Sequence, residues 1–107
     1  MDIMVTLKSR NKNYSATGKY IDSKNFVVCK GSQIYLNNDS VVSKKVMNFR
    51  ENAEFVNENG IVIKDCVFGS PSTAAQFVNG SSTNGYVAWK VGKQSLKEYL
   101  ADRESEV

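Results

Sequence analysis

Hydroxyl side chains gather at the expected start of a short helix in the second half of this chain. Ser70, Ser72 and Thr73 surround Pro71 there. The first backbone N–H groups of a helix have no partner within it, so together with nearby hydroxyls they can bind an anion such as phosphate. Alternatively, the hydroxyls only cap the helix, with Ser70 accepting hydrogen bonds from those N–H groups. This segment is therefore either an anion-binding helix start or a structural cap.

A second set of candidate residues follows this helix, in a polar loop and an aromatic segment. Hydroxyl, amide and ammonium groups contact nucleic-acid phosphates, and aromatic rings stack on bases. With two lysines from the N-terminal half, the candidate nucleic-acid contact comprises Ser81, Ser82, Thr83, Asn84, Tyr86, Trp89, Lys90, Lys19 and Lys30. In the alternative interpretation, Tyr86 and Trp89 are aromatics of the core or its boundary.

The remaining reactive side chains do not form a catalytic set. The sequence contains no histidine, which excludes serine–histidine, cysteine–histidine and histidine–metal sites. Glu51, Glu54 and Glu58 have the spacing of an exposed helix face. The segment 92–95 lacks the Ser or Thr that a phosphate-binding loop needs after its lysine. We expect no enzyme, no catalytic residue, no metal and no cofactor.

The two cysteines, Cys29 and Cys66, are far apart in the sequence, and each lies in an apolar run. This placement favours reduced thiols buried in the core, over a disulfide or a reactive thiol. No apolar run is long enough to span a membrane, and the N-terminus does not resemble a secretory signal. We therefore expect a cytoplasmic protein with no membrane contact.

Basic side chains are concentrated in the first half of the chain. Residues 1–50 carry nine basic and three acidic side chains, a formal charge of +6, whereas residues 51–107 carry five basic and eight acidic ones, a charge of −3. A basic half suits a polyanionic partner, although lysine-rich strand faces are also common on solvated surfaces.

The N-terminal third alternates apolar and polar residues, which predicts strands joined by turns. The expected strands are 3–8, 14–20, 26–30 and a shorter one at 34–36. Further along, segment 61–68 predicts one bent strand or two short ones, and segment 86–90 an aromatic strand.

Helical spacing appears in three places. Val46, Phe49, Ala53 and Val56 predict one long amphipathic helix over about 42–57, begun by Ser40 or Ser43 and ended near Asn59 and Gly60, whose apolar stripe covers the sheet. Ser70, Pro71 and Gly80 delimit a second helix. A third, over about 94–101, has Leu96, Tyr99 and Leu100 on its apolar side, and residues 102–107 are expected to fray.

These elements predict a single α+β domain over residues 1–107. A small mixed or antiparallel sheet of N-terminal hairpins is expected to pack against the long helix, followed by a short helix, a strand and a final helix. A chain of 107 residues can bury one core without metal or disulfide support.

Three stretches of the sequence carry a family resemblance: SPSTAAQFVNG…NGYVAWK over 70–90, ATGKY over 16–20 and FVVCKGS over 26–32. They are similar to the SPSAAA…G…NGW…WK, AxGxY and FVVLKGS stretches of domain-of-unknown-function family 4357, and the resemblance covers about residues 14–100. Tyr86 stands where the family usually has tryptophan, and Cys29 where it usually has leucine.

The resemblance implies a context rather than a reaction. Domains of this family are often appended to GIY-YIG nuclease domains or found beside restriction–modification genes, and the similar RAMA domain is thought to contact DNA. This sequence contains no GIY-YIG nuclease domain. The first hypothesis is therefore a non-enzymatic accessory module that binds DNA. The alternative is a protein-interaction module that docks to a nuclease or methylase subunit, or forms a homodimer by extending its sheet.

Overall fold

The computed structural model describes residues 2–9, 13–35, 44–81 and 83–105. Within these ranges the chain forms six strands and four helices. In chain order they are β1 (Ile3–Ser9), β2 (Tyr14–Asp22), β3 (Asn25–Val28), α1 (Lys44–Glu51), β4 (Cys66–Phe68), α2 (Pro71–Asn79), α3 (Gly85–Ala88), β5 (Lys90–Val91), β6 (Gln94–Ser95) and α4 (Leu96–Ser105).

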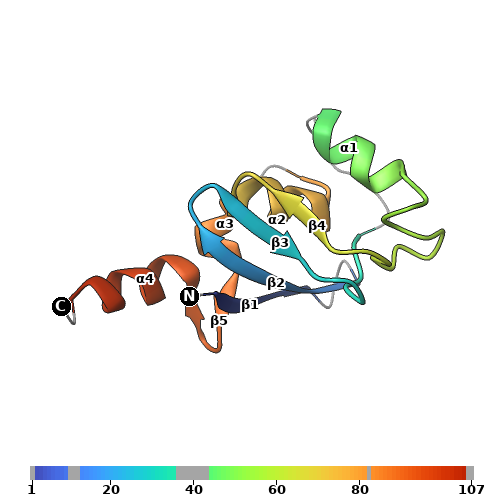
Figure 1. The fold of residues 1–107 in the computed structure, drawn as a ribbon. Helices are drawn as coiled ribbons and strands as arrows, with labels where there is room; N and C mark the ends of the chain where they lie inside the picture. The colour runs from blue at the N-terminus through green and yellow to red at the C-terminus, as the bar shows by residue number, and fades with distance from the viewer. Residues whose placement is uncertain (1, 10–12, 36–43, 82, 106–107) are drawn as a thin grey trace.

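The six strands form one antiparallel sheet in the order β4-β3-β2-β1-β5-β6 (Figure 1). The hairpin of β1 and β2 is its longest pairing and runs from Ile3 opposite Tyr20 to Ser9 opposite Tyr14. The C-terminal part of the chain then returns to the free side of β1, where Lys90 lies opposite Thr6. The expected α+β class and the N-terminal hairpins are confirmed.

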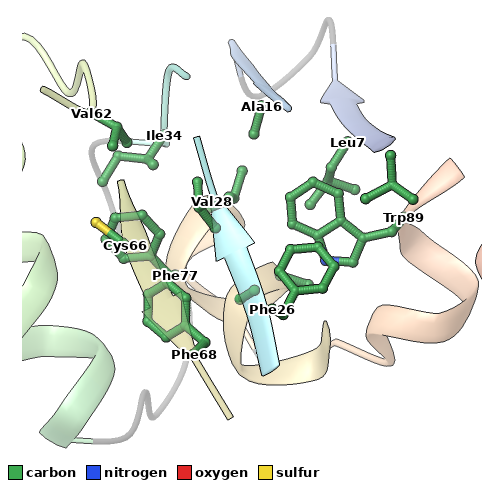
Figure 2. Packing of buried hydrophobic residues seen from close by; sticks show 14 of the residues in the cluster. Leu7, Ala16, Phe26, Val28, Ile34, Val62, Cys66, Phe68, Phe77 and Trp89 are labelled. Carbon is green, nitrogen blue, oxygen red and sulfur yellow. The ribbon is translucent and has the colours of Figure 1, made fainter. Parts of the chain in front are cut away.

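The register separates the sheet into a core face and an open face. Side chains alternate along each strand, so Ile3, Val5 and Leu7 of β1 share one face, which is buried. On the neighbouring strands the same face carries Phe26, Val28, Cys66 and Phe68, which Figure 2 shows together with Phe77 and Trp89. This continuous apolar layer is the core of the domain.

Helix α2 covers the core face of the sheet. Phe77 packs on Phe68 with ring centroids 5.0 Å apart, and Ala74 and Ala75 are fully buried. Ser70 caps the start of α2, and Gly80 ends the helix in the left-handed conformation, with φ 72°. Both boundaries agree with the prediction.

The helix expected over 42–57 is shorter, and it reaches the sheet at its edge, where the ring centroid of Phe49 lies 4.9 Å from that of Phe68 in β4. Helix α1 ends at Glu51 and packs against α2, while α2 itself covers the strands (Figure 1). Asn52 explains the early end, because its Oδ1 accepts the N–H of Glu54 and so replaces a helical hydrogen bond. Val56 instead forms a β-bridge with Val62. The proposed caps at 40 and 43 lie outside the described residues.

Arg50 joins the end of α1 to the end of α2. Its guanidinium donates to the carbonyl of Phe77 over 2.6 Å and to the carbonyl of Tyr35. The C-terminal carbonyls of a helix carry partial negative charge, so a cation is favourable there. Partial burial of this cation lowers the pKa of Arg50.

Three further expectations need correction. Segment 34–36 is not a strand in its described part; the preceding Gln33 forms bridges to Ser15 and Ile61. The expected aromatic strand over 86–90 begins instead as helix α3, and only Lys90 belongs to a strand. Helix α4 starts at Leu96 and continues through Ser105, beyond the expected end near 101.

Candidate nucleic-acid interface

The hydroxyls at the start of α2 make internal hydrogen bonds. Ser70 Oγ accepts the N–H of Thr73 over 3.1 Å and lies 2.9 Å from Thr73 Oγ1. Ser72 Oγ accepts the N–H of Gly85 over 2.9 Å. Pro71 is buried. This geometry supports the structural interpretation of the helix start, because the same groups hold α2 against α3.

Helix α3 lies against this helix start through Asn84 and Gly85. Asn84 Oδ1 accepts the N–H of Tyr86 and thereby caps α3, which explains why the expected strand begins as a helix. Gly85 is needed for the close approach, since a Cβ at this position would lie 2.2 Å from the carbonyl of Pro71. The Asn-Gly pair therefore places α3 on α2.

Trp89 belongs to the core. Its side chain is fully buried, and its ring centroid lies 4.7 Å from that of Phe26 (Figure 2). The indole Nε1 donates to the carbonyl of Pro71 over 3.0 Å, so the polar atom of the ring is also satisfied. In this structure the indole offers no face on which a base could stack.

Tyr86 is half-buried beside the core. Its ring meets that of Tyr20 edge-on at 6.3 Å. Burial, followed by the hydrogen bond to Tyr86, raises the pKa of Tyr20. Tyr86 is therefore an aromatic residue at the boundary of the core.

The polar loop before α3 is also held by internal hydrogen bonds. The buried Asn79 donates from Nδ2 to Thr83 Oγ1 over 2.6 Å and accepts the N–H of Ser81 over 3.0 Å. Thr83 Oγ1 in turn donates to the carbonyl of Ser81. Ser82 lies outside the described residues. The described hydroxyls of this loop thus support its own turn.

The lysines lie on the other side of the sheet. Met4, Thr6 and Lys8 of β1 alternate with the buried residues of that strand and therefore project from the opposite face. Directly paired residues project from the same face, so the pairing extends this face across the sheet. We define the open face by nine side chains: Met4, Thr6, Lys8, Ser15, Thr17, Lys19, Val27, Val67 and Lys90.

The open face is ordered in rows across the strands. The first is mainly apolar, with Val67, Val27, Lys19 and Met4 in neighbouring positions. The second places Thr17 beside Thr6 and Thr6 beside Lys90. The third contains Ser15 and Lys8 and continues through the bridge from Ser15 to Gln33.

The structure brings only some of the predicted contact residues together. Lys19 and Lys90 share the open face, with Lys8 nearby on β1. Asn84 is on the helix-covered side, because the helix it caps packs on α2 (Figure 1). Lys30 follows the end of β3, where its N–H donates to Asp65 Oδ1 over 2.8 Å. Lys90 therefore does not lie beside the polar loop as predicted, because the two are on opposite sides of the sheet.

The electrostatics of the open face are moderately positive. Lys19 Nζ lies 4.0 Å from Asp2 Oδ2, and both side chains are largely exposed, so this pair is weak.

Cys29 borders the face, because its N–H donates to the carbonyl of Thr17. Burial, followed by the negative charge of Asp65, raises the pKa of the Cys29 thiol.

Two features of this side were missed by the sequence-based prediction. Thr6 and Thr17 place hydroxyls between the lysines, and a hollow lies beside Lys8 at the end of the hairpin. The alternation of Ile3, Val5 and Leu7 could have indicated the outward position of Thr6, whereas the hollow depends on a bridge to Gln33, which local patterns do not show.

The described residues form no metal-binding cluster of histidine, cysteine, aspartate or glutamate. Cys29 and Cys66 are both free thiols. Cys66 is buried in the core as expected, whereas Cys29 is only half-buried. In the part of the chain that the structure describes, no helix is long and apolar enough to cross a membrane.

Fold and site together define a small α+β domain with one sheet face covered by helices and the other exposed. A family model described as Domain of unknown function (DUF4357) matches residues 6–100, so the chain belongs to the DUF4357 family. The family resemblance of the sequence is thereby confirmed. Neither a curated protein nor a solved structure matches the chain.

Proposed function

We propose that this domain is a non-enzymatic accessory module that binds DNA through the open face of its sheet, in a restriction–modification or nuclease context. The observation that carries the proposal is the convergence of Lys8, Lys19 and Lys90 on one exposed face around Thr6 and Thr17. Lysine ammonium and threonine hydroxyl groups are common contacts to phosphate oxygens. The proposal assigns the domain no cofactor and a cytoplasmic location.

The composition of the open face favours phosphate contacts over base contacts. Its nine defining side chains include no aromatic ring, and Trp89 is buried. Stacking therefore contributes little, and affinity comes mainly from release of counterions by the lysines. We expect weak sequence preference and strong salt dependence.

Fluorescence anisotropy with a labelled duplex of about 20 base pairs tests the proposal at low salt. The variant Lys8→Gln/Lys19→Gln/Lys90→Gln removes three charges from the open face. Its matched control, Lys44→Gln/Lys45→Gln/Lys97→Gln, removes three exposed charges from α1 and α4 and gives the same formal charge. We expect the first variant to bind about tenfold more weakly than the control. Equal affinities, or no binding by the wild-type chain, would refute the proposal.

A second function, protein interaction, is favoured by the apolar row of the same face. The side chains of Met4 and Val67 are 53% and 56% exposed, and Val27 lies between them in the sheet with Lys19. Size-exclusion chromatography with light scattering distinguishes this candidate. A dimer that dissociates in Met4→Ser/Val67→Ser would support it, and a strict monomer without a copurifying partner would oppose it.

A further inference from the structure

A polar hollow of about 490 Å³ lies at the closed end of the hairpin of β1 and β2. Pockets of a few hundred Å³ are typical of small-molecule sites, and this volume is larger than a single phosphate ion requires. Among the residues that the structure describes, the lining comprises Lys8, Ser9, Asn13, Tyr14, Ser15 and Gln33.

The lining has the chemistry of a site for a phosphate ester. Lys8 supplies one ammonium group, and none of the described lining residues carries a carboxylate. Hydroxyl groups come from serine and tyrosine side chains, and amides from Asn13 and Gln33. An ammonium together with neutral donors suits an oxyanion, and Tyr14 adds an aromatic ring against which a base or sugar can pack.

The wall of the hollow is held in place by the backbone. Ser15 and Gln33 exchange two hydrogen bonds, with the N–H of Ser15 donating over 3.0 Å and that of Gln33 over 2.7 Å. Gln33 Nε2 also donates to the carbonyl of Asn59 over 3.2 Å. A wall held in this way lowers the ordering cost of binding a ligand.

The other prominent hollow, of about 430 Å³, lacks these properties. It lies beside α1, and its lining includes Arg50 but also the carboxylates of Glu51 and Glu58. The guanidinium of Arg50 already donates to two backbone carbonyls. Repulsion by the two carboxylates disfavours an anion in this second hollow, and the Arg50 guanidinium already donates hydrogen bonds within the protein.

We propose that the hollow beside Lys8 binds one nucleotide unit, with its phosphate on the Lys8 ammonium and its base or sugar against Tyr14. The hollow is continuous with the third row of the open face, in which Lys8 and Ser15 are paired. The choice of a nucleotide over another phosphate ester rests on the proposed function. A strand that crosses the open face therefore places one nucleotide in this pocket.

Nuclear magnetic resonance titration of the full chain with deoxyadenosine monophosphate tests the pocket. We expect the amide signals of Ser15 and Gln33 to shift, and the affinity of Lys8→Gln to fall about tenfold. Lys97→Gln, on exposed α4, should bind like the wild type. No shift of these signals at about 10 mM nucleotide would overturn the inference.

Two further titrations identify the ligand. Inorganic phosphate should bind several-fold more weakly than the nucleotide, and Tyr14→Leu should reduce only the affinity for the nucleotide. Equal affinities for the two ligands would overturn the assignment to a nucleotide. Because Lys8 also belongs to the open face, the variant Lys19→Gln/Lys90→Gln separates the two proposals: it should lose DNA affinity while retaining nucleotide binding. Nucleotide binding without any DNA binding would refute only the proposed function.

Discussion

At the scale of single residues, the sequence motif that identifies the family holds the domain together. Ser72 accepts the N–H of Gly85, and Pro71 accepts the indole N–H of Trp89. These contacts join the start of α2 to α3 and to the residue before β5. The SPS and NG…W segments, more than ten residues apart, therefore form one packing unit.

Gly85→Ala tests how tight this unit is. A Cβ at position 85 would lie 2.2 Å from the backbone of Pro71, which cannot move independently of α2. We expect the free energy of unfolding, measured in urea, to fall by about 3 kcal/mol. Gly69→Ala is the control, since a Cβ there meets no atom within 4 Å, and its effect should be about 0.5 kcal/mol or less. Equal effects of the two substitutions would contradict the packing described.

The burial of Trp89 leads to a spectroscopic prediction. Because the indole is fully buried, acrylamide should quench its fluorescence weakly in the native protein and strongly in urea. Single-stranded DNA should leave the emission nearly unchanged. Strong quenching by DNA at low salt would instead show that a base reaches Trp89.

Cys66 gives a pH-dependent prediction. Burial, followed by the charge of Asp65, raises the pKa of this thiol from 9.0 to about 12. The folded state therefore holds the proton more tightly than the unfolded state. This contribution to stability is fully present below pH 9 and is lost as the pH rises towards 12.

Urea unfolding of the wild type and of Cys66→Ala between pH 8 and pH 11 measures this effect. The variant should be less stable at pH 8, because it leaves a cavity, but its stability should decline less as the pH rises. Parallel declines would show that the thiol does not titrate differently on folding.

At the scale of elements, local signals predicted α2 well and α1 poorly. Ser70, Pro71 and Gly80 act on the backbone directly beside them, and they gave both ends of α2. The apolar spacing through Val56 suggested a longer α1, but Asn52 turns the chain and Val56 pairs with Val62. A local side-chain hydrogen bond and a distant pairing thus outweighed helical periodicity.

The site was harder to predict than the fold. Lys90 and Asn84 are close in sequence, yet α3 lies between them and directs them to opposite sides of the sheet. The position of Lys90 depends on pairing with Thr6, which is more than eighty residues away. Lys19 was correctly expected on a strand, but its neighbours across the sheet depend on the whole register.

Ser70→Ala tests the structural interpretation of the helix start. Loss of the cap to the Thr73 N–H should cost about 1 kcal/mol in the free energy of unfolding. Ser23→Ala, in the exposed turn between β2 and β3, is the control and should change it by about 0.5 kcal/mol or less. An unchanged stability of Ser70→Ala with a loss of phosphate binding would favour an anion site instead.

At the scale of the whole molecule, helices and charges are divided between two sides of one sheet. Helix α2 lies on one side of the sheet (Figure 1), together with the aromatic core. The register of β1, β2 and β5 directs the side chains of Lys8, Lys19 and Lys90 to the other side. The SPS and NG…W residues of the family motif therefore stabilise the sheet from its core face, and the proposed DNA contact lies on the open face. Within the described part of the motif over 70–90, only Lys90 belongs to the open face, while the SPS and NG…W residues contact the core side of the domain.

The salt dependence of DNA affinity is the most direct test of the proposal that the lysines of the open face contact DNA. If Lys8, Lys19 and Lys90 each neutralise one phosphate, the logarithm of the association constant should fall with the logarithm of salt concentration with a slope of about −3. The open-face triple variant should bring that slope close to zero, and the control variant on α1 and α4 should leave it unchanged. A slope that the control variant reduces as much as the open-face variant would contradict a DNA contact on the open face.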